Sequence, residues 1–239
     1  MKILVCDINS DIIKDNLIDS INKFMSKGNK VIICTNKSIN YIADLLATSS
    51  IDCEYYICNG GAVIFDKYYN VLYRKDMKQE LVRPIMNMLD DDENILESFV
   101  DTSHGFTKDT SKIANGIVAR YFDEAKSDML VNSICLKYPD IYGYSNDNWI
   151  NILDKDANKK NALNYIIDTY HLNKNAFIIL GKNIEDLDIM KEFKSYNYKD
   201  CCEDIKNYSS GEINSLEDFI NNFLKAQEKR ELDAIYENI

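Results

Sequence analysis

Polar or acidic residues directly follow four short apolar runs in this sequence, at Asp7, Thr35, Asn59 and the segment 181–186. A carboxylate can act as a nucleophile or as a metal ligand, whereas hydroxyl and amide groups can hold an anion. Ligands of open α/β sheets bind beyond the carboxyl ends of the strands. If the four runs are neighbouring parallel strands, these side chains converge, and the pattern indicates an enzyme or a ligand-binding protein.

The elements that would position these residues alternate between strands and helices. Strands are predicted at 2–6, 31–35 and 55–58, with a helix over 12–25 and another after Ser38. This alternation, at these lengths, predicts a parallel sheet with crossover helices. An aspartate after a buried strand can also simply cap a helix, so Asp7 alone would not establish a site.

The pattern changes after the third strand and later resumes. A β-hairpin, a helix over 77–90, and irregular short strands with one helix near 123–132 are predicted before residue 153. Further along, the predicted elements are helices at 158–171 and 184–193, a strand at 176–180 and a long helix from Ser215. We therefore predict an α/β protein. Its core is a Rossmann-like, doubly wound parallel sheet (residues 1–76 and 154–239), and an α+β cap domain (77–153) is inserted into it.

Composition excludes several classes of protein. The formal net charge is −11 and the charges are scattered, which disfavours nucleic-acid binding. The apolar runs are too short to span a membrane or to form the core of a signal peptide. Seven cysteines without a CxxC pair, and two distant histidines, indicate a reducing compartment and argue against zinc. We expect a cytoplasmic protein, and the oligomeric state is left open.

The run Asp7-Ile8-Asn9-Ser10-Asp11 is similar to the first motif, D-x-D-G-T, of the haloacid dehalogenase superfamily. The resemblance implies that Asp7 is a nucleophile that forms an aspartyl-phosphate. The second aspartate of the motif acts on the leaving oxygen as a general acid and base. Here it is replaced by Asn9, which can donate a hydrogen bond but cannot transfer a proton.

Two further segments resemble the Cof-type sugar-phosphate phosphatases of this superfamily, which carry a large inserted cap. Thr35, in VIICTNKS, matches the residue that holds a phosphoryl oxygen, with Asn36 following it. The long segment ICNGGAVIFDKYYNVLY, residues 57–73, is similar to the stretch that leads toward the cap. The resemblance implies that Asn36, Asn59 and Gly60 contact the substrate.

The last two motifs lie after the predicted cap. Lys159, in NKKNALNYI, matches the lysine that neutralises charge on the phosphoryl group, although a lysine in a first helical turn can also simply be solvated. In Gly181-Lys182-Asn183-Ile184-Glu185-Asp186 the family pattern is G-D-x-x-N-D, whose acidic residues hold Mg²⁺. Lys182 reverses the charge at the first acidic position. The resemblance still allows Asp7, Glu185 and Asp186 as metal ligands.

Two functions follow from these motifs. The first is a Mg²⁺-dependent phosphatase of small phosphorylated metabolites such as sugar phosphates, with impaired catalysis, in which Asp7, Asn9, Thr35 and Lys159 are the catalytic residues. The second is an inactive relative that binds a phosphorylated ligand or an anion without a metal. In that reading the Lys182 ammonium takes the place of the metal ion and, with Lys159 nearby, binds the anionic substrate. A third reading, partner binding through the C-terminal helix, rests on its apolar spacing alone.

Overall fold

The larger of the two sheets contains the predicted parallel core. The computed structural model describes residues 1–8, 15–47, 49 and 51–236. The strands of this sheet are β1 Ile3–Cys6, β2 Lys30–Cys34, β3 Tyr55–Cys58, β4 Val63–Asp66, β5 Val71–Arg74, β11 Phe177–Gly181, β12 Ser195–Tyr198 and β13 Glu212–Ile213. Their order is β13-β12-β11-β1-β2-β3-β4-β5. Pairing is parallel from β13 to β3, and the β4–β5 hairpin adds antiparallel strands.

Helices cover both faces of this sheet because its central strands are apolar on both sides. The helices are α1 Asp15–Ser26, α2 Ile39–Leu46, α5 Lys159–Thr169, α6 Leu187–Glu192, α7 Glu203–Lys206 and α8 Leu216–Tyr236. Leu4 and Cys6 of β1 pack with α1, α2 and α8 on one face. Ile3 and Val5, which point the other way, pack with α5, α6 and α7. The doubly wound α/β fold predicted from the sequence is confirmed.

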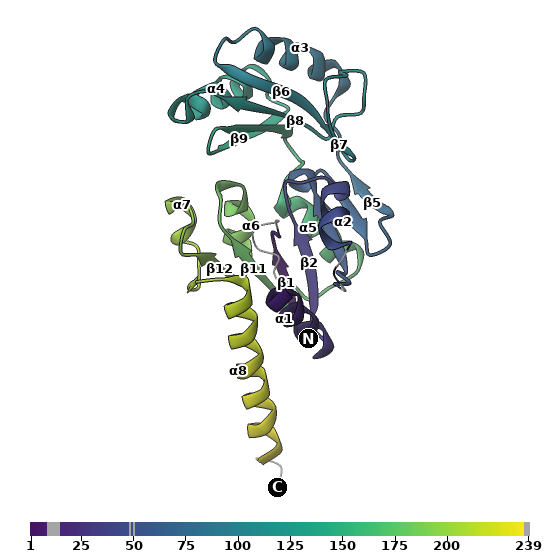
Figure 1. The fold of residues 1–239 in the computed structure, drawn as a ribbon, viewed down its shortest axis with the longest axis vertical. Coiled ribbons are helices and arrows are strands. Elements are labelled where there is room, and N and C mark those ends of the chain that lie inside the picture. The colour runs from purple at the N-terminus through teal and green to yellow at the C-terminus, as the bar shows by residue number, and fades with distance from the viewer. Residues whose placement is uncertain (9–14, 48, 50, 237–239) are drawn as a thin grey trace.

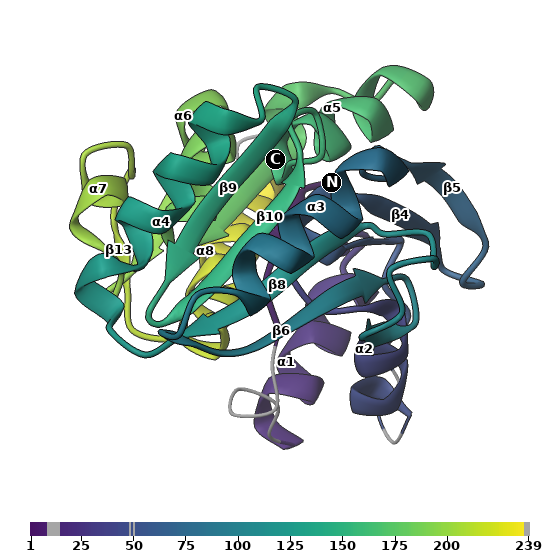
Figure 2. The ribbon, with the colours of Figure 1, turned by 90° about the horizontal axis from the view of Figure 1, so that it is seen from above.

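A second sheet forms the cap (Figure 1). Its strands are β6 Ile95–Thr102, β7 Gly105–Thr107, β8 Gly116–Tyr121, β9 Ile141–Asn146 and β10 Trp149–Asp154. They pair antiparallel in the order β7-β6-β8-β10-β9. Helices α3 Gln79–Asp90 and α4 Glu124–Lys137 cover the face turned away from the larger sheet (Figure 2). The prediction of irregular short strands in this segment is therefore wrong, since the sheet is regular and β6 alone is eight residues long.

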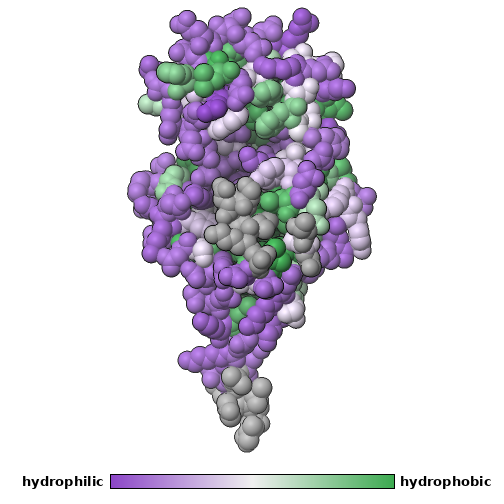
Figure 3. Space-filling model, viewed as in Figure 1, coloured by the Kyte–Doolittle hydropathy of each residue, from purple (hydrophilic) through white to green (hydrophobic). Residues whose placement is uncertain are grey.

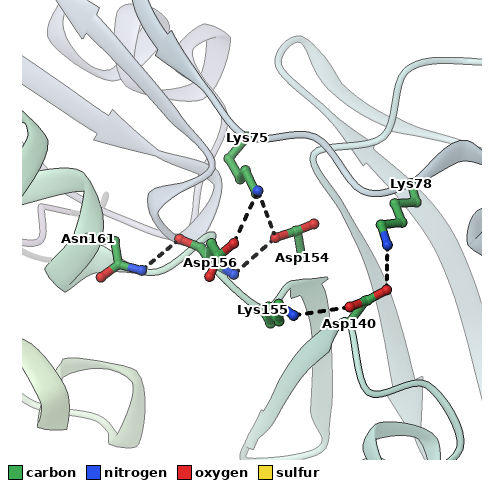
Figure 4. Close-up of polar contacts among 7 residues, drawn as sticks. All are labelled: Lys75, Lys78, Asp140, Asp154, Lys155, Asp156 and Asn161. Carbon is green, nitrogen blue, oxygen red and sulfur yellow. Dashed lines mark hydrogen bonds and ion pairs between the residues drawn. The ribbon is translucent and has the colours of Figure 1, made fainter.

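Ion pairs tie together the two chain segments that connect the sheets (Figure 4). Lys75 Nζ lies 3.2 Å from Asp156 Oδ2 and 3.5 Å from Asp154 Oδ1. Asp140 pairs with Lys155 at 3.1 Å and also with Lys78. Most of these side chains are at least one-third exposed, so the pairs contribute little stability individually. We keep the boundaries at residues 76 and 154 as a proposal.

Helix α8 extends well beyond the body of the molecule (Figure 1). Its first half packs on α1, where the Phe24 and Phe223 rings lie 5.5 Å apart. The face of the molecule shown in Figure 3 is mostly hydrophilic, with apolar side chains in small patches. Across the described part of the chain, no helix combines the length and apolar character needed to span a bilayer.

A glycine turn after β3 lets the chain pass very close to the start of α5. The short helix η1, Asn59–Gly61, has positive φ at all three residues: 50° at Asn59, 65° at Gly60 and 101° at Gly61. A Cβ on Gly61 would lie 2.3 Å from the backbone carbon of Asn158 and 2.6 Å from the amide nitrogen of Lys159. The absence of a side chain at Gly61 thus positions the residue that begins α5.

Replacement of Gly61 by alanine should destabilise the protein strongly. The new Cβ would overlap backbone atoms, and the left-handed conformation adds a further penalty, for a total of about 2–5 kcal/mol. Gly28→Ala is the matched control, because Gly28 also has positive φ (78°) but nothing lies within 4 Å of its Cβ position. That control should cost only about 1–2 kcal/mol. Urea unfolding of both variants measures the difference, and equal losses would contradict the close-contact argument.

Candidate functional site

Four neighbouring strands, in the order β11-β1-β2-β3, end at the same edge of the larger sheet. Asp7 follows β1, Thr35 follows β2 and Asn59 follows β3, while β11 leads into the segment that carries Glu185 and Asp186. Lys159, the first residue of α5, reaches the same place. The structure thus brings Asp7, Thr35, Lys159, Glu185 and Asp186 together, and their chemical roles stay predictions.

Lys159 is the cation of this cluster and is only 2% exposed. Its Nζ lies 2.7 Å from Asp186 Oδ1 and 3.8 Å from Glu185 Oε1. Burial by itself would lower the pKa of Lys159, but Asp186 and Glu185 raise it well above the ordinary value, so the ammonium stays charged. The alternative of a solvated lysine is therefore wrong.

Asp7 is the candidate nucleophile and lies beside Lys159 and Thr35. Burial raises its pKa to about 6, against the lowering effect of the Lys159 ammonium and of the hydrogen bond with the Thr35 side chain. The nearby Asp186 and Glu185 carboxylates raise it further. Above pH 6 the carboxylate is ionised and acceptor-only, the state required of a nucleophile.

Asp186 holds the loop after β11 in place. Its Oδ2 accepts hydrogen bonds from the backbone amides of Lys182 (2.9 Å) and Asn183 (3.2 Å), and its Oδ1 accepts from Lys159. Both oxygens are therefore engaged by the protein itself.

Glu185 is the carboxylate with a free oxygen. Its Oε1 accepts from Asn36 Nδ2 at 2.7 Å, and its Oε2 is buried without a hydrogen-bond partner among the described residues. A buried acceptor without a donor is costly, so this oxygen is available for a ligand or a cation.

Lys182 lies outside the cluster. Its Nζ pairs with Asp200 Oδ2 at 2.5 Å, and its side chain is 47% exposed. At the surface this ammonium keeps its hydration and a counter-ion, whereas a position beside Lys159 would bring two buried cations together. This position contradicts the hypothesis that the Lys182 ammonium takes the place of a metal ion, whereas substrate binding by Lys182 stays a prediction.

Of the other predicted residues, Asn36, Asn59 and Gly60 lie together where the larger sheet meets the cap. Asn59 Nδ2 donates to Asp101 Oδ2 (3.0 Å) and to the Thr102 carbonyl oxygen (3.1 Å), both on β6 of the cap. Asn9 lies outside the described residues.

Asp101 was missed by sequence reasoning. It is 5% exposed, and burial raises its pKa to about 7, although Asn59 and Lys37 lower it. A carboxylate directly after the apolar pair Phe99-Val100 in a strand was the available signal.

A cleft of about 650 Å³ opens between the cap and the larger sheet beside the helix η3, Ile184–Asp186, which carries Glu185 and Asp186. The cap side of this cleft is acidic, through Asp123, Glu124, Asp128 and Asp147. No lysine or arginine is among the described residues that line it. A short helix, η2 Lys174–Ala176, lies outside this region.

The oxygen donors of the cluster suit Mg²⁺ in type, because that ion prefers carboxylate oxygens and often takes only one or two of them. The unpartnered Glu185 Oε2 and the Asp7 carboxylate are the available donors, whereas Asp186 is engaged as described. Within the described residues, no group of three or more His, Cys, Asp or Glu is arranged to hold a metal ion. Metal binding by Asp7, Glu185 and Asp186 stays a prediction.

Comparison with known proteins now identifies the family. A family model described as haloacid dehalogenase-like hydrolase matches residues 5–129, more than half of the chain. The chain belongs to the haloacid dehalogenase-like hydrolases. The predicted family is confirmed, while no curated protein matches the sequence.

Solved structures share the whole fold, cap included. A HAD/COF-like hydrolase from Plasmodium vivax superimposes with a TM-score of 0.82 at 14% identity, over 95% of this chain and 96% of that one. A HAD subclass IIB sugar phosphatase gives 0.76 at 16% identity, over 93% and 99%. A haloacid dehalogenase-like hydrolase from B. subtilis gives 0.75 at 14% identity, over 89% and 94%.

Substitution of Lys159 by methionine should destabilise the protein by about 3–5 kcal/mol, because the buried carboxylates lose their only close ammonium partner among the described residues. Lys225→Met, at an exposed position of α8, is the control and should change stability by about 0.5 kcal/mol or less, as is usual for the surface. Urea denaturation measures both. Similar losses in the two variants would contradict a charge cluster centred on Lys159.

Substitution of Asp7 by asparagine should stabilise the protein at pH 8. The pKa of Asp7 is raised in the folded state, so its ionisation costs stability as the pH rises from about 4 to 6, and the full cost remains above pH 6. Asparagine removes that cost, so the gain at pH 8 should be about 3 kcal/mol and should vanish near pH 4. Denaturation of both proteins at pH 8, 6 and 4 tests this, and a gain independent of pH would refute it.

Proposed function

We propose that this protein is a phosphatase of small phosphorylated metabolites that works through an aspartyl-phosphate on Asp7. The observation that carries the proposal is the buried Lys159 ammonium, held among carboxylates at the carboxyl ends of β1 and β11. Such a cation stabilises negative charge on a transferring phosphoryl group. The hydrolase family and the fold shared with a sugar phosphatase support it.

In this mechanism each residue of the cluster has one task. A carboxylate oxygen of Asp7 attacks phosphorus, an Asp7–phosphorus bond forms, and the bond to the substrate oxygen breaks as that oxygen takes a proton from water. The Thr35 hydroxyl and the Lys159 ammonium orient the phosphoryl oxygens. A second water then attacks phosphorus and gives a proton to the hydroxide that the first step left. The bond between the Asp7 oxygen and phosphorus breaks, which releases phosphate and restores the Asp7 carboxylate.

A metal ion would add to this charge balance. Asp7 and Glu185 are the residues that would hold Mg²⁺, and the bound ion would neutralise negative charge on the phosphoryl oxygens. Proton transfer by water, in place of an acidic side chain at position 9, is expected to slow the reaction by about 10²–10⁴-fold.

The metal-free alternative loses its main support. It relied on the Lys182 ammonium inside the site, and that ammonium pairs with Asp200 instead. Lys159 alone would have to hold the anion, and it is already bonded to Asp186.

Turnover of p-nitrophenyl phosphate and a panel of sugar phosphates with Mg²⁺ tests the proposal. Asp7→Asn should lower kcat/KM by about 10³-fold or more, as expected on loss of a nucleophile. Asp19→Asn, which changes an exposed aspartate of α1, should keep the activity of the unmodified protein. Absence of turnover in the unmodified protein, or equal activity in Asp7→Asn, would refute the proposal.

A further inference from the structure

A small cavity lies where the larger sheet meets the cap. Its volume is about 10 Å³, which is enough for one group the size of a water molecule. The core contributes Asn36, Asn59 and Gly60 to its wall, and the cap contributes Asp101 and Tyr144. Gly60 keeps this space open, because a Cβ there would lie 3.6 Å from Asn36 Oδ1 and 3.1 Å from Leu153 Cδ2.

Three oxygen atoms of these lining residues are buried and have no hydrogen-bond donor among the described residues. They are Asn36 Oδ1, Asn59 Oδ1 and Asp101 Oδ1. Asn59 and Asp101 are 1% and 5% exposed, so bulk water does not compensate them.

The hydrogen-bond partners of the two amide nitrogens fix the orientations that leave these oxygens free. Asn59 Nδ2 donates to Asp101 Oδ2 and to the Thr102 carbonyl oxygen, and Asn36 Nδ2 donates to Glu185 Oε1. All three partners are acceptors, so rotating either amide would face oxygen toward oxygen. In the arrangement observed, no described residue donates to these three oxygens, so a ligand can supply the donor.

An ammonium group satisfies this requirement better than a hydroxyl. An ammonium has three donors and no acceptor, matching three acceptor oxygens, whereas a hydroxyl brings one donor and its own lone pairs. Above about pH 7 the Asp101 carboxyl is ionised and also supplies the counter-charge, and hydrogen bonds between charged groups are the stronger ones.

A separate cleft beside η3 is acidic and favours the same ligand. The cleft beside Glu185 and Asp186 is lined on the cap side by the four acidic residues named above and, among described residues, by no lysine or arginine. This surface repels a simple phosphate dianion and attracts a molecule that also carries a cation. Asn36 connects the two places, since it lines the cavity and donates to Glu185 of the candidate site.

We propose that the cavity formed by Asn36, Asn59 and Asp101 binds a protonated primary amine, and that the substrate is therefore an amine-bearing phosphomonoester. The amine lies between the two sheets while the phosphoryl group lies at Asp7 and Lys159. This inference rests on the proposed function, because it assigns the organic part of the substrate to that same site.

The test is a series of phosphate esters that vary in chain length and in the charge of the terminal group. Isothermal titration calorimetry of the Asp7→Asn protein with Mg²⁺ present, so that turnover does not interfere, gives affinities for ω-aminoalkyl phosphates of two to five carbons. The ω-hydroxyalkyl and plain alkyl phosphates of equal length are the comparison. At one chain length the amine should bind about 10- to 100-fold more tightly than both. Equal binding would mean that the cavity holds only water, and tighter binding of the alcohol would exclude an ammonium site; either result overturns the proposal.

Variants of the lining residues test whether the preference for the amine arises in this cavity. Asp101→Asn replaces an acceptor by a donor, and the ratio of amine to alkyl affinity should fall to about threefold or less. Asn36→Ser, which removes a different acceptor, should also reduce it. Glu93→Gln removes one exposed carboxylate of the cap far from the cavity wall and should leave the ratio unchanged. A preference that survives Asp101→Asn and Asn36→Ser would place amine recognition elsewhere and overturn the proposal.

The two proposals fail in different ways. If the esters bind without any preference for the amine, the cavity assignment fails and the phosphoryl site stands. If neither these esters nor inorganic phosphate binds, the proposed function fails, and the amine assignment fails with it.

Discussion

A buried lysine ammonium surrounded by carboxylates is the constraint around which this structure is organised. Lys159 is almost completely buried and lies 2.7 Å from Asp186. Removing such a charge from water is costly and is compensated only when partners are close and well oriented. Those partners come from the ends of two neighbouring strands: Asp7 after β1, and Glu185 and Asp186 after β11. The charges can meet only if β1 and β11 are neighbours, so the site and the sheet order depend on each other.

Several backbone features hold that ammonium in place. Asn158 caps α5 by accepting a hydrogen bond from the Asn161 amide at 2.8 Å, and Gly61 lets the turn after β3 touch the Asn158 backbone. Asp186 closes the loop after β11 through two backbone amides. The turn after β3 also carries Asn59, whose side chain donates a hydrogen bond to Asp101 on β6 of the cap. The charge cluster and the cap are thus linked through residues 59–61, and a ligand in the cleft contacts both.

Much of this arrangement could be predicted from sequence because it depends on local rules. Apolar runs predicted the strands that end at Asp7 and Thr35, and the 62–74 hairpin followed from its turn. The short strand β12 was missed, since its run Ser-Tyr-Asn-Tyr is only four residues long and contains no aliphatic residue. The direction of the Lys182 side chain depends on Asp200, 18 residues away, which no local pattern reveals. Asp101 pairs with Asn59, 42 residues distant and in the other sheet, so its burial could be seen only once the cap was placed.

The central claim is that the charge cluster exists to hold a phosphoryl group on Asp7. Chemical trapping tests this most directly: the protein is mixed with a reactive phosphate ester and Mg²⁺, quenched with borohydride, and digested for peptide mass spectrometry. Borohydride reduces an acyl phosphate to an alcohol, so the label marks the residue that carried it. The account predicts that the Asp7 side chain is reduced, and that the reduction disappears when the ester is omitted. Turnover of the ester without reduction at Asp7, or with reduction at another carboxylate, would contradict it.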